Sequence, residues 1–251
     1  MVATFRAPST PPDAVVATLR RRGYAVLAAD DVATLCGVPL DGLQALAASW
    51  NDLPPDDYLR DGGRYRQRRH ACFVVGADDC VRVPHRAHYQ PLDYNALHGG
   101  LQRWFAPMAP ATVDAPVWAR MLRALGACLR EVRDGDPWYV EAHQFRIDTR
   151  DGIGRPTPEG AHRDGVDFVA VFIVDRHAIR GGETRVFEAD GPDGQRFTLT
   201  EPWSLLLLDD TRMIHETTPI QPADAAAGEG GAGHRDTLVL TFRSGGFQSE
   251  A

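Results

Sequence analysis

The chain has 251 residues and a formal net charge of −7, and all 27 of its basic residues are arginine. This length suits one large β-rich or α+β domain that buries a sizeable core. The absence of lysine excludes Schiff-base chemistry, a P-loop lysine and a kinase lysine, and the acidic charge argues against general affinity for nucleic acid.

Cysteine usage and the N-terminal sequence bear on the compartment and the partners. The four cysteines form no C-x-x-C pair, which predicts reduced and mostly buried thiols. Met1 to Ala14 holds no apolar signal region, and no apolar run approaches the length of a membrane span. We expect a cytoplasmic protein with a small-molecule partner, no nucleic-acid or membrane partner, and a homodimer as one open oligomeric state.

The first half of the chain is predicted to be rich in helices. Apolar residues at helical spacing predict five helices and one short strand between the first two: helices at 14–22, 30–36, 40–50, 101–105 and 115–133, and a strand at 24–27. The helix over 115–133 has the longest apolar stripe, and we expect it to pack on a sheet.

Residues 54–88 are unusually rich in arginine, and 66–75 alternates as a strand does. One interpretation is an exposed edge strand covered by salt bridges. The other is that one or two of these arginines, with Arg66 as the candidate, reach the site and bind a substrate carboxylate.

From Trp138 onward the hydrophobic period changes to two. The pattern predicts seven strands, at 138–147, 168–175, 183–189, 196–201, 204–209, 214–221 and 237–243. A hairpin turn is predicted at 190–194, and the Ala/Gly/Glu-rich stretch 223–233 is expected to be a surface loop.

Helices followed by many antiparallel strands favour an α+β fold with a jelly-roll core. We expect a double-stranded β-helix, similar to a cupin, with supporting N-terminal helices. The chain is predicted to form a single domain over 1–251. Residues 1–135 would provide helical support and a substrate lid, and residues 136–245 would form the metal-binding core.

The metal hypothesis rests on the order of three residues. His162 and Asp164 form a His-x-Asp motif, and His215 follows on a later strand. A second motif, His234-Arg235-Asp236, has no histidine after it, so it cannot complete the same pattern. Two imidazoles and one carboxylate on one face of a metal are the ligand set of non-haem Fe(II) oxygenases.

Other interpretations of the same motif stay open. A kinase catalytic loop fails, because no asparagine follows His162-Arg163-Asp164 at the required spacing. A zinc hydrolase could use the same three ligands, with Glu159 or Glu183 as the general base. His162 and His215 could also be ordinary structural histidines of a barrel.

Several segments together resemble the Fe(II)/2-oxoglutarate-dependent dioxygenases, and more narrowly the bacterial branch that contains the L-isoleucine 4-hydroxylase. The resemblance covers most of the chain beyond about residue 55. It is carried by His143-Gln144-Phe145-Arg146-Ile147, Pro158 to Gly165, Gly181 to Arg185, Arg235 to Leu238, Arg64 to Arg69 and Asp93 to Gly100.

The resemblance implies a double-stranded β-helix with Fe(II) held by His162, Asp164 and His215. It implies 2-oxoglutarate and O2 as co-substrates, with succinate and CO2 as products. Halogenases of this superfamily have a small residue in place of the carboxylate ligand. The presence of Asp164 therefore implies hydroxylation.

The 2-oxoglutarate carboxylate calls for a planar bidentate donor inside the barrel. Arg235 and Arg243 bracket the last predicted strand, and Thr237 follows Arg235 by two residues. This is similar to the Arg-x-Ser/Thr pattern of the family. We therefore predict Arg235 and Thr237 as co-substrate ligands, with Arg243 as the second choice.

The substrate is expected to be a small free L-amino acid. Alternation along 138–147 puts Gln144 and Arg146 on one face, and Glu159 lies close to His162 in sequence. We predict that Arg146, or an arginine of 64–69 such as Arg66, binds the carboxylate, and that Glu159 binds the ammonium group. The resemblance points to an isoleucine- or leucine-like side chain, with a lysine-like one as the alternative.

Three other functions remain as alternatives. An oxygenase of this type could act on a peptide- or carrier-bound residue, or on another small metabolite. Action on an alkylated base is disfavoured by the acidic charge and by the lack of base-stacking motifs. The third is a barrel that binds a metal or ligand without catalysis.

Overall fold

We analysed the protein in a computed structural model, which describes residues 5–95, 97, 99–223 and 232–249. Its helices are α1 (Val15–Arg22), α2 (Ala29–Cys36), α3 (Leu40–Ala45), α4 (Pro110–Val113) and α5 (Pro116–Val132), with 3-10 helices η1 (Pro12–Ala14) and η2 (Leu46–Asp52). The strands of the first half are β1 (Tyr24–Leu27), β2 (Arg66–Val75) and β3 (Cys80–Arg82). Those of the second half are β4 (Trp138–Asp148), β5 (Phe168–His177), β6 (Ile179–Gly181), β7 (Thr184–Glu188), β8 (Gly194–Phe197), β9 (Leu205–Asp209), β10 (Met213–Thr217), β11 (Ile220–Pro222) and β12 (His234–Arg243).

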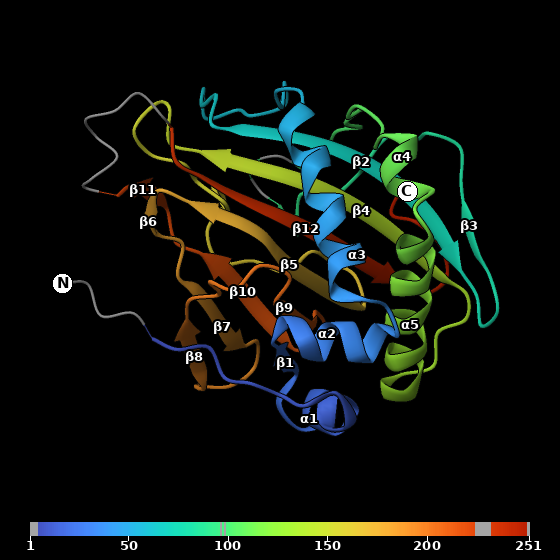
Figure 1. The fold of residues 1–251 in the computed structure, drawn as a ribbon. Helices are drawn as coiled ribbons and strands as arrows, with labels where there is room; N and C mark the ends of the chain where they lie inside the picture. Colours follow the sequence, from blue (N-terminus) through green and yellow to red (C-terminus); the bar gives the residue numbers. More distant parts are fainter. Residues whose placement is uncertain (1–4, 96, 98, 224–231, 250–251) are drawn as a thin grey trace.

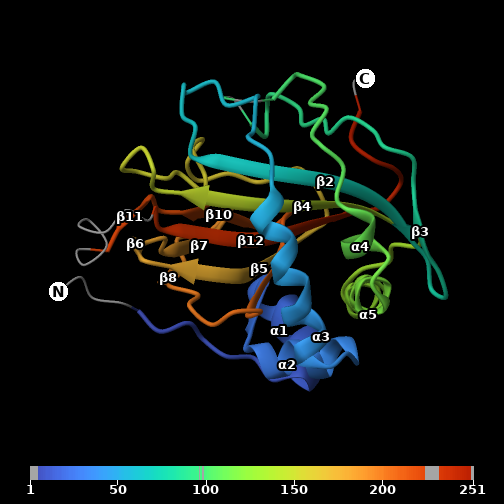
Figure 2. The ribbon, with the colours of Figure 1, turned by 45° about the horizontal axis from the view of Figure 1, so that its top comes forward.

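The strands form one large and two small antiparallel sheets. The large sheet has seven strands in the order β1-β9-β5-β12-β4-β2-β3, and β10-β7-β8 form a three-stranded sheet. The helices α1, α2, α3 and α5 cover one face of the large sheet, and the three-stranded sheet lies against the other (Figures 1 and 2). This arrangement is a jelly roll with supporting helices, and the predicted fold class is confirmed.

Side-chain alternation divides the large sheet into two faces with different chemistry. Leu238, Leu240 and Phe242 of β12 face the helices and belong to the same buried cluster as Leu122 and Leu125 of α5. The intervening residues of β12 face the interior of the barrel. The site is built on this interior face.

The interior face combines an apolar part with a polar part. Between the two sheets, Val169 and Ile173 of β5 pack in one buried cluster with Val186 and Phe197. On β4 and β2 the interior positions are instead polar or aromatic, and they include Arg66, Arg68, His70, Glu141, His143 and Phe145. Buried polar groups are costly unless they are paired, so this half of the barrel is suited to bind a ligand.

Several predicted elements differ in the structure. Residues 101–105 form no helix, and the predicted strand over 214–221 is divided into β10 and β11. Strand β8 begins and ends earlier than predicted, while β3 and β6 were not predicted. The expected loop over 223–233 falls largely outside the described residues.

The four cysteines are free thiols, and three of them are buried, as the spacing predicts. Within the described chain, no single helix is long and apolar enough to cross a membrane. One pair, α2 with Leu40–Asp52, passes that test only when both parts are taken together, and it is bent by 103°.

Candidate metal centre

His162 and Asp164 lie in the loop between β4 and β5, next to His215 of β10. The amide of His162 donates to the carbonyl of His215 at 3.0 Å, and the amide of His215 donates back to the carbonyl of His162 at 2.9 Å. This two-bond bridge fixes the two backbones side by side. Residues 53 positions apart in the chain therefore place their imidazoles together, with ring centroids 4.6 Å apart.

The three side chains converge as metal ligands do. Nε2 of His162 lies 3.6 Å from Oδ1 of Asp164, and Nε2 of His215 lies 3.8 Å from Oδ2 of the same carboxylate. Nδ1 of His162 is 2.9 Å from the carbonyl oxygen of Gly160, to which it donates. This hydrogen bond places the proton on Nδ1 and leaves the Nε2 lone pair free for a metal. The donor set therefore fits a divalent metal such as Fe(II).

Asp210 supports the loop that carries Asp164. Its carboxylate accepts hydrogen bonds from the amides of Asp164 (3.0 Å), Gly165 (2.8 Å) and Val166 (3.1 Å). Gly165 has φ +77°, a conformation that favours glycine. Burial, together with the charge of Asp164, raises the pKa of Asp210 to about 7. The three amides hold Asp164 in place without occupying its carboxylate.

The three side chains shift one another's pKa values. Burial opposes a charge on His162, but the hydrogen bond and the charge of Asp164, together with Glu159, raise its pKa to about 10. Burial and the neighbouring His162 lower the pKa of His215 to about 4. Although burial alone would raise the pKa of Asp164, the two imidazoles hold it below its usual range. A divalent cation would replace the proton that now balances this carboxylate.

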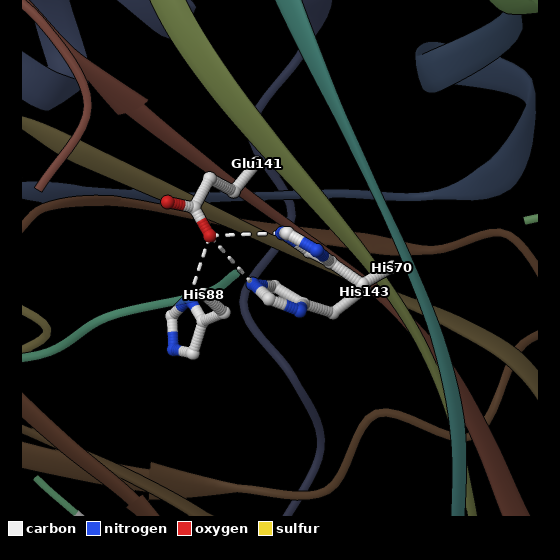
Figure 3. Close-up of side chains that lie close together, drawn as sticks. All are labelled: His70, His88, Glu141 and His143. Carbon is white, nitrogen blue, oxygen red and sulfur yellow. Dashed lines mark hydrogen bonds and ion pairs between the residues drawn. The ribbon is translucent and has the colours of Figure 1, made fainter. Parts of the chain in front are cut away.

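Two further groups in the described chain have ligand atoms close enough to hold a metal. Asp175, His234 and Asp236 form one, but both oxygens of Asp236 already accept from Arg146, at 2.8 and 2.6 Å. The other combines three imidazoles with one carboxylate, a ligand type known from iron sites: His70, His88, Glu141 and His143. Figure 3 shows its rings converging on one oxygen of Glu141.

Arg235 and Thr237 lie on the interior face of β12, and residues further along that face, Val239 and Thr241, line a pocket with Asp164. Arg235 is 4% exposed, and its Nε has no hydrogen-bond partner among the described residues. Burial, and next the charge of Arg176, lower its pKa to about 9. A buried guanidinium with an unused donor calls for an anion.

Arg243, the second choice for the co-substrate, is at the other end of β12. Its Nη1 donates to the carbonyl of Gly246 at 2.6 Å, and its side chain lines the pocket. Arg235 is therefore the more deeply buried of the two arginines and has the less satisfied guanidinium.

The pocket beside Asp164 has a volume of about 100 Å³, and the predicted residues Arg66 and Glu159 both line it. Arg66 pairs with Asp56 at 2.7 Å, yet its Nη2 has no partner among the described residues. Oε1 of Glu159 lies 3.5 Å from Nε2 of His162, and its Oε2 is buried without a described partner.

The prediction for Gln144 and Arg146 is corrected by the structure. Both side chains point to the helix-covered face of β4, away from the pocket. Gln144 donates to Oγ of Ser49 at 2.7 Å, and Arg146 forms its ion pair with Asp236. The two residues do share one face of the strand, as alternation requires. Since β4 is buried on both faces, hydrophobicity did not show which face carries the site.

Among the pocket residues that were not singled out from the sequence are Arg68, His88, Arg103 and Glu141. Arg68 lies over the rings of Phe105 and Phe145, with its Cζ 3.5 and 4.4 Å from their centroids. Arg103 is 3% exposed, and its Nε and Nη2 have no partner in the described chain. The arginine-rich composition of 54–88 was a signal for Arg68, but Arg103 fell in a wrongly predicted helix.

The fold and the site define the general class of this protein. It is a jelly roll whose barrel holds a His/Asp/His group with the geometry of metal ligands. Comparison with protein families identifies the family within this class, because a model of the 2OG-Fe dioxygenases matches residues 47–241. The chain belongs to this family, whose reactions use Fe(II), 2-oxoglutarate and O2.

Solved structures agree with this assignment. A bsmA homolog from Methylobium petroleophilum PM1 is 50% identical, with full coverage of both chains and a TM-score of 0.91. IDO from Bacillus thuringiensis is 15% identical, covers 97% of this chain and 100% of its own, and has a TM-score of 0.72. The dioxygenase TqaL is 17% identical over 93% of this chain and 87% of its own, with a TM-score of 0.70. The last two likenesses concern the fold alone. No curated protein matches the sequence.

Replacement of Asp210 by asparagine should weaken metal binding by roughly 10- to 100-fold, since outer ligands of this kind orient the metal-binding residues. Asparagine keeps the size of the side chain but removes one of the oxygens that hold the 164–166 amides. Titration of the metal-free protein with Fe(II) under anaerobic conditions measures the effect. Asp193→Asn, in an exposed turn, is the control. Equal affinities for Asp210→Asn and wild type would contradict this role.

Proposed function

We propose that this protein is an Fe(II)- and 2-oxoglutarate-dependent dioxygenase that hydroxylates an unactivated C–H bond of a free L-amino acid. The side chain of the substrate would be isoleucine- or leucine-like, or lysine-like. The proposal includes membership of the free amino acid hydroxylases within the family. The observation that carries the proposal is a small pocket in which unpaired buried arginine donors and carboxylates lie together beside the His/Asp/His group.

We assign the metal to His162, Asp164 and His215. When bound there, Fe(II) with 2-oxoglutarate and O2 supplies the oxidising chemistry, and 2-oxoglutarate leaves as succinate and CO2. The chain contributes three ligands on one side of the ion and leaves the other side open. The hydrogen bond from His162 to Gly160 and the Asp210 amide contacts hold these ligands in orientation.

Arg235 and Thr237 are proposed to bind the distal carboxylate of 2-oxoglutarate. The Nε of Arg235 is an unused donor in this part of the barrel, as is Nη1 of Arg176, and the Thr237 side chain is on the same face of β12 as Arg235. Arg176, opposite Arg235 on β5, adds positive charge. The buried Arg235 and its neighbour Arg176 would be stabilised by an anionic ligand, which the co-substrate provides.

The carboxylate of the amino acid is assigned to Arg66 and Arg103, with Arg68 beside them. All three line the pocket, and each has at least one guanidinium nitrogen without a described partner. Burial, and the neighbouring Arg66, lower the pKa of Arg103 to about 10, whereas Asp56, Glu159 and Glu141 oppose that shift. A carboxylate bound here would satisfy the free donors and offset the mutual repulsion of the arginines.

The size of the pocket supports a small substrate. Its volume of about 100 Å³ lies below the roughly 300 Å³ at which pockets for drug-sized ligands begin. Val166, Val239 and Phe247 add an apolar wall that suits an aliphatic side chain. We further propose that the chain is a single domain and that the segment between β3 and α4 covers the substrate, since Gln90, Asn95 and Arg103 come from it.

Alanine at His162, Asp164 or His215 should abolish Fe(II)-dependent succinate formation and leave the protein folded, because each change removes one of three ligands. His234→Ala is the matched control, since it alters the other His-x-Asp motif outside the proposed centre. Succinate assays and circular dichroism provide the readouts. Wild-type turnover by Asp164→Ala would reject the metal assignment.

Arg235→Ala should raise the KM for 2-oxoglutarate by roughly 10- to 100-fold, the size expected for losing a charge-assisted hydrogen bond. The KM for the amino acid should change much less, because different arginines bind it. Steady-state kinetics with each substrate varied in turn separates the two effects. Equal increases in both constants, or a larger effect from Arg243→Ala, would show that the choice of Arg235 is wrong.

The test of the substrate class is a panel of the twenty L-amino acids with Fe(II), 2-oxoglutarate and O2. We expect at least one amino acid to gain one oxygen by mass, with succinate formed in equal amount. Peptides that contain the same residue should not react. Turnover only on a peptide- or carrier-bound residue, or on another metabolite, would reject a free amino acid. Metal binding without 2-oxoglutarate turnover on any substrate would favour a non-catalytic barrel.

A further inference from the structure

The group formed by His70, His88, Glu141 and His143 is not used by the proposed metal centre. His70 comes from β2, Glu141 and His143 come from β4, and His88 comes from the segment after β3. Three of the four are at most 6% exposed. Figure 3 shows His70, His88 and His143 arranged around one oxygen of Glu141.

The shortest distance within this group is that of a hydrogen bond and is too short for two ligand atoms of one metal. Oε2 of Glu141 lies 2.9 Å from Nε2 of His70 and 2.5 Å from Nδ1 of His88. Two atoms bound to one metal at about 2.1 Å are roughly 3 Å or more apart. The N–H groups of His70 and His88 therefore donate hydrogen bonds to the carboxylate of Glu141.

Arg68 adds a second argument against a metal in this group. Its Nη2 lies 2.7 Å from Nδ1 of His143, and a guanidinium can only donate. The Nδ1 of His143 is therefore an acceptor, so the neutral ring carries its proton on Nε2, the atom that faces Glu141 at 3.8 Å. That nitrogen has no lone pair to offer a cation, and the adjacent guanidinium repels one.

Instead of a metal site, the group provides two hydrogen-bond acceptors at the pocket wall, one on Glu141 and one on His88. Glu141 and His88 both line the pocket. The second oxygen of Glu141 and the second nitrogen of His88 point away from the bonded atoms in Figure 3 and have no partner among the described residues. Burial lowers the pKa of His88 to about 4, so its ring is neutral and its Nε2 accepts.

We propose that Glu141 and His88 bind the α-ammonium group of the substrate, a role that rests on the amino acid function proposed above. The ammonium group has three donors and a positive charge, which matches one carboxylate oxygen and one imidazole nitrogen. Glu141 and Phe145 lie on the same face of β4, with His143 between them. The guanidinium of Arg68 lies over the ring of Phe145. Anchors for the ammonium and carboxylate groups thus stand next to each other.

This proposal gives Glu159 a different place from the one predicted. Oε1 of Glu159 lies 3.5 Å from Nε2 of His162, the atom assigned to the metal, so Glu159 stands on the metal side of the pocket. Glu141 is on β4, where His70 and His88 hold its orientation. Because Oε2 of Glu141 accepts both imidazole protons, its free oxygen is preorganised for a ligand.

The test measures binding without turnover. Calorimetry of the anaerobic protein with Fe(II) and 2-oxoglutarate compares L-isoleucine, or the best amino acid of the panel, with the same molecule lacking its amino group. Wild type should bind the amino acid about 10- to 100-fold more tightly, the range for a hydrogen bond to a charged group. In Glu141→Gln and His88→Ala, most of this preference should disappear, while affinity for the desamino acid stays the same.

Each alternative gives a different result. An equal loss for both ligands would show that Glu141 is only structural, and a loss of preference in Glu159→Gln instead would move the anchor there. A second metal ion, present in wild type and absent from Glu141→Gln by elemental analysis, would overturn the proposal. If no amino acid binds wild type, the proposed function itself fails. Glu188→Gln, on β7 outside the pocket, is the control, and thermal unfolding confirms that the variants fold.

Discussion

Burial of charge inside the barrel is the constraint on which the rest of this structure depends. The interior face of β2 and β4 carries arginines, histidines and a glutamate where a simple jelly roll would have apolar side chains. Such groups are tolerated only if they are paired or if a ligand pairs them. Asp56 pairs with Arg66, and Glu141 accepts from two imidazoles. The donors left over mark where ligands belong.

The leftover donors of the described residues include two groups that bear on ligand binding. Arg235 lies on the interior face of β12 with Arg176 opposite, and the group Arg66, Arg68 and Arg103 lies in the pocket beside Asp164. The family reaction uses 2-oxoglutarate, which is an anion, and the proposed amino acid substrate would bring a further carboxylate. The unpaired arginines therefore agree with two anionic ligands, the co-substrate and the proposed substrate.

Much of the architecture could be predicted because local patterns determine it. The apolar stripe of α5, the alternation of β4 and β12, and the Gly23 that ends α1 in a left-handed conformation are all local signals. The order of His162, Asp164 and His215 also identified three side chains that the structure brings together. The backbone bridge between His162 and His215 was not visible in the sequence, because it joins two segments that are far apart in the chain.

Other parts depend on which face of an element is buried, and the sequence does not contain this information. Arg146 was predicted to bind substrate because it alternates with Gln144, yet the helix-covered face is polar at that end of β4, where Asp236 pairs with Arg146. Glu141, which lies four residues before Phe145 on the interior face of β4, was overlooked for the same reason. Arg103 and His88 come from a segment without periodicity, and only tertiary contacts place them in the pocket.

The metal and co-substrate assignments are tested most directly by a crystal structure of the anaerobic protein with Fe(II) and 2-oxoglutarate, with anomalous data collected at the iron edge. We expect one iron peak between His162, Asp164 and His215, and the distal carboxylate of 2-oxoglutarate on Arg235. An iron peak between His70, His88, Glu141 and His143, with none at the first position, would contradict the metal assignment.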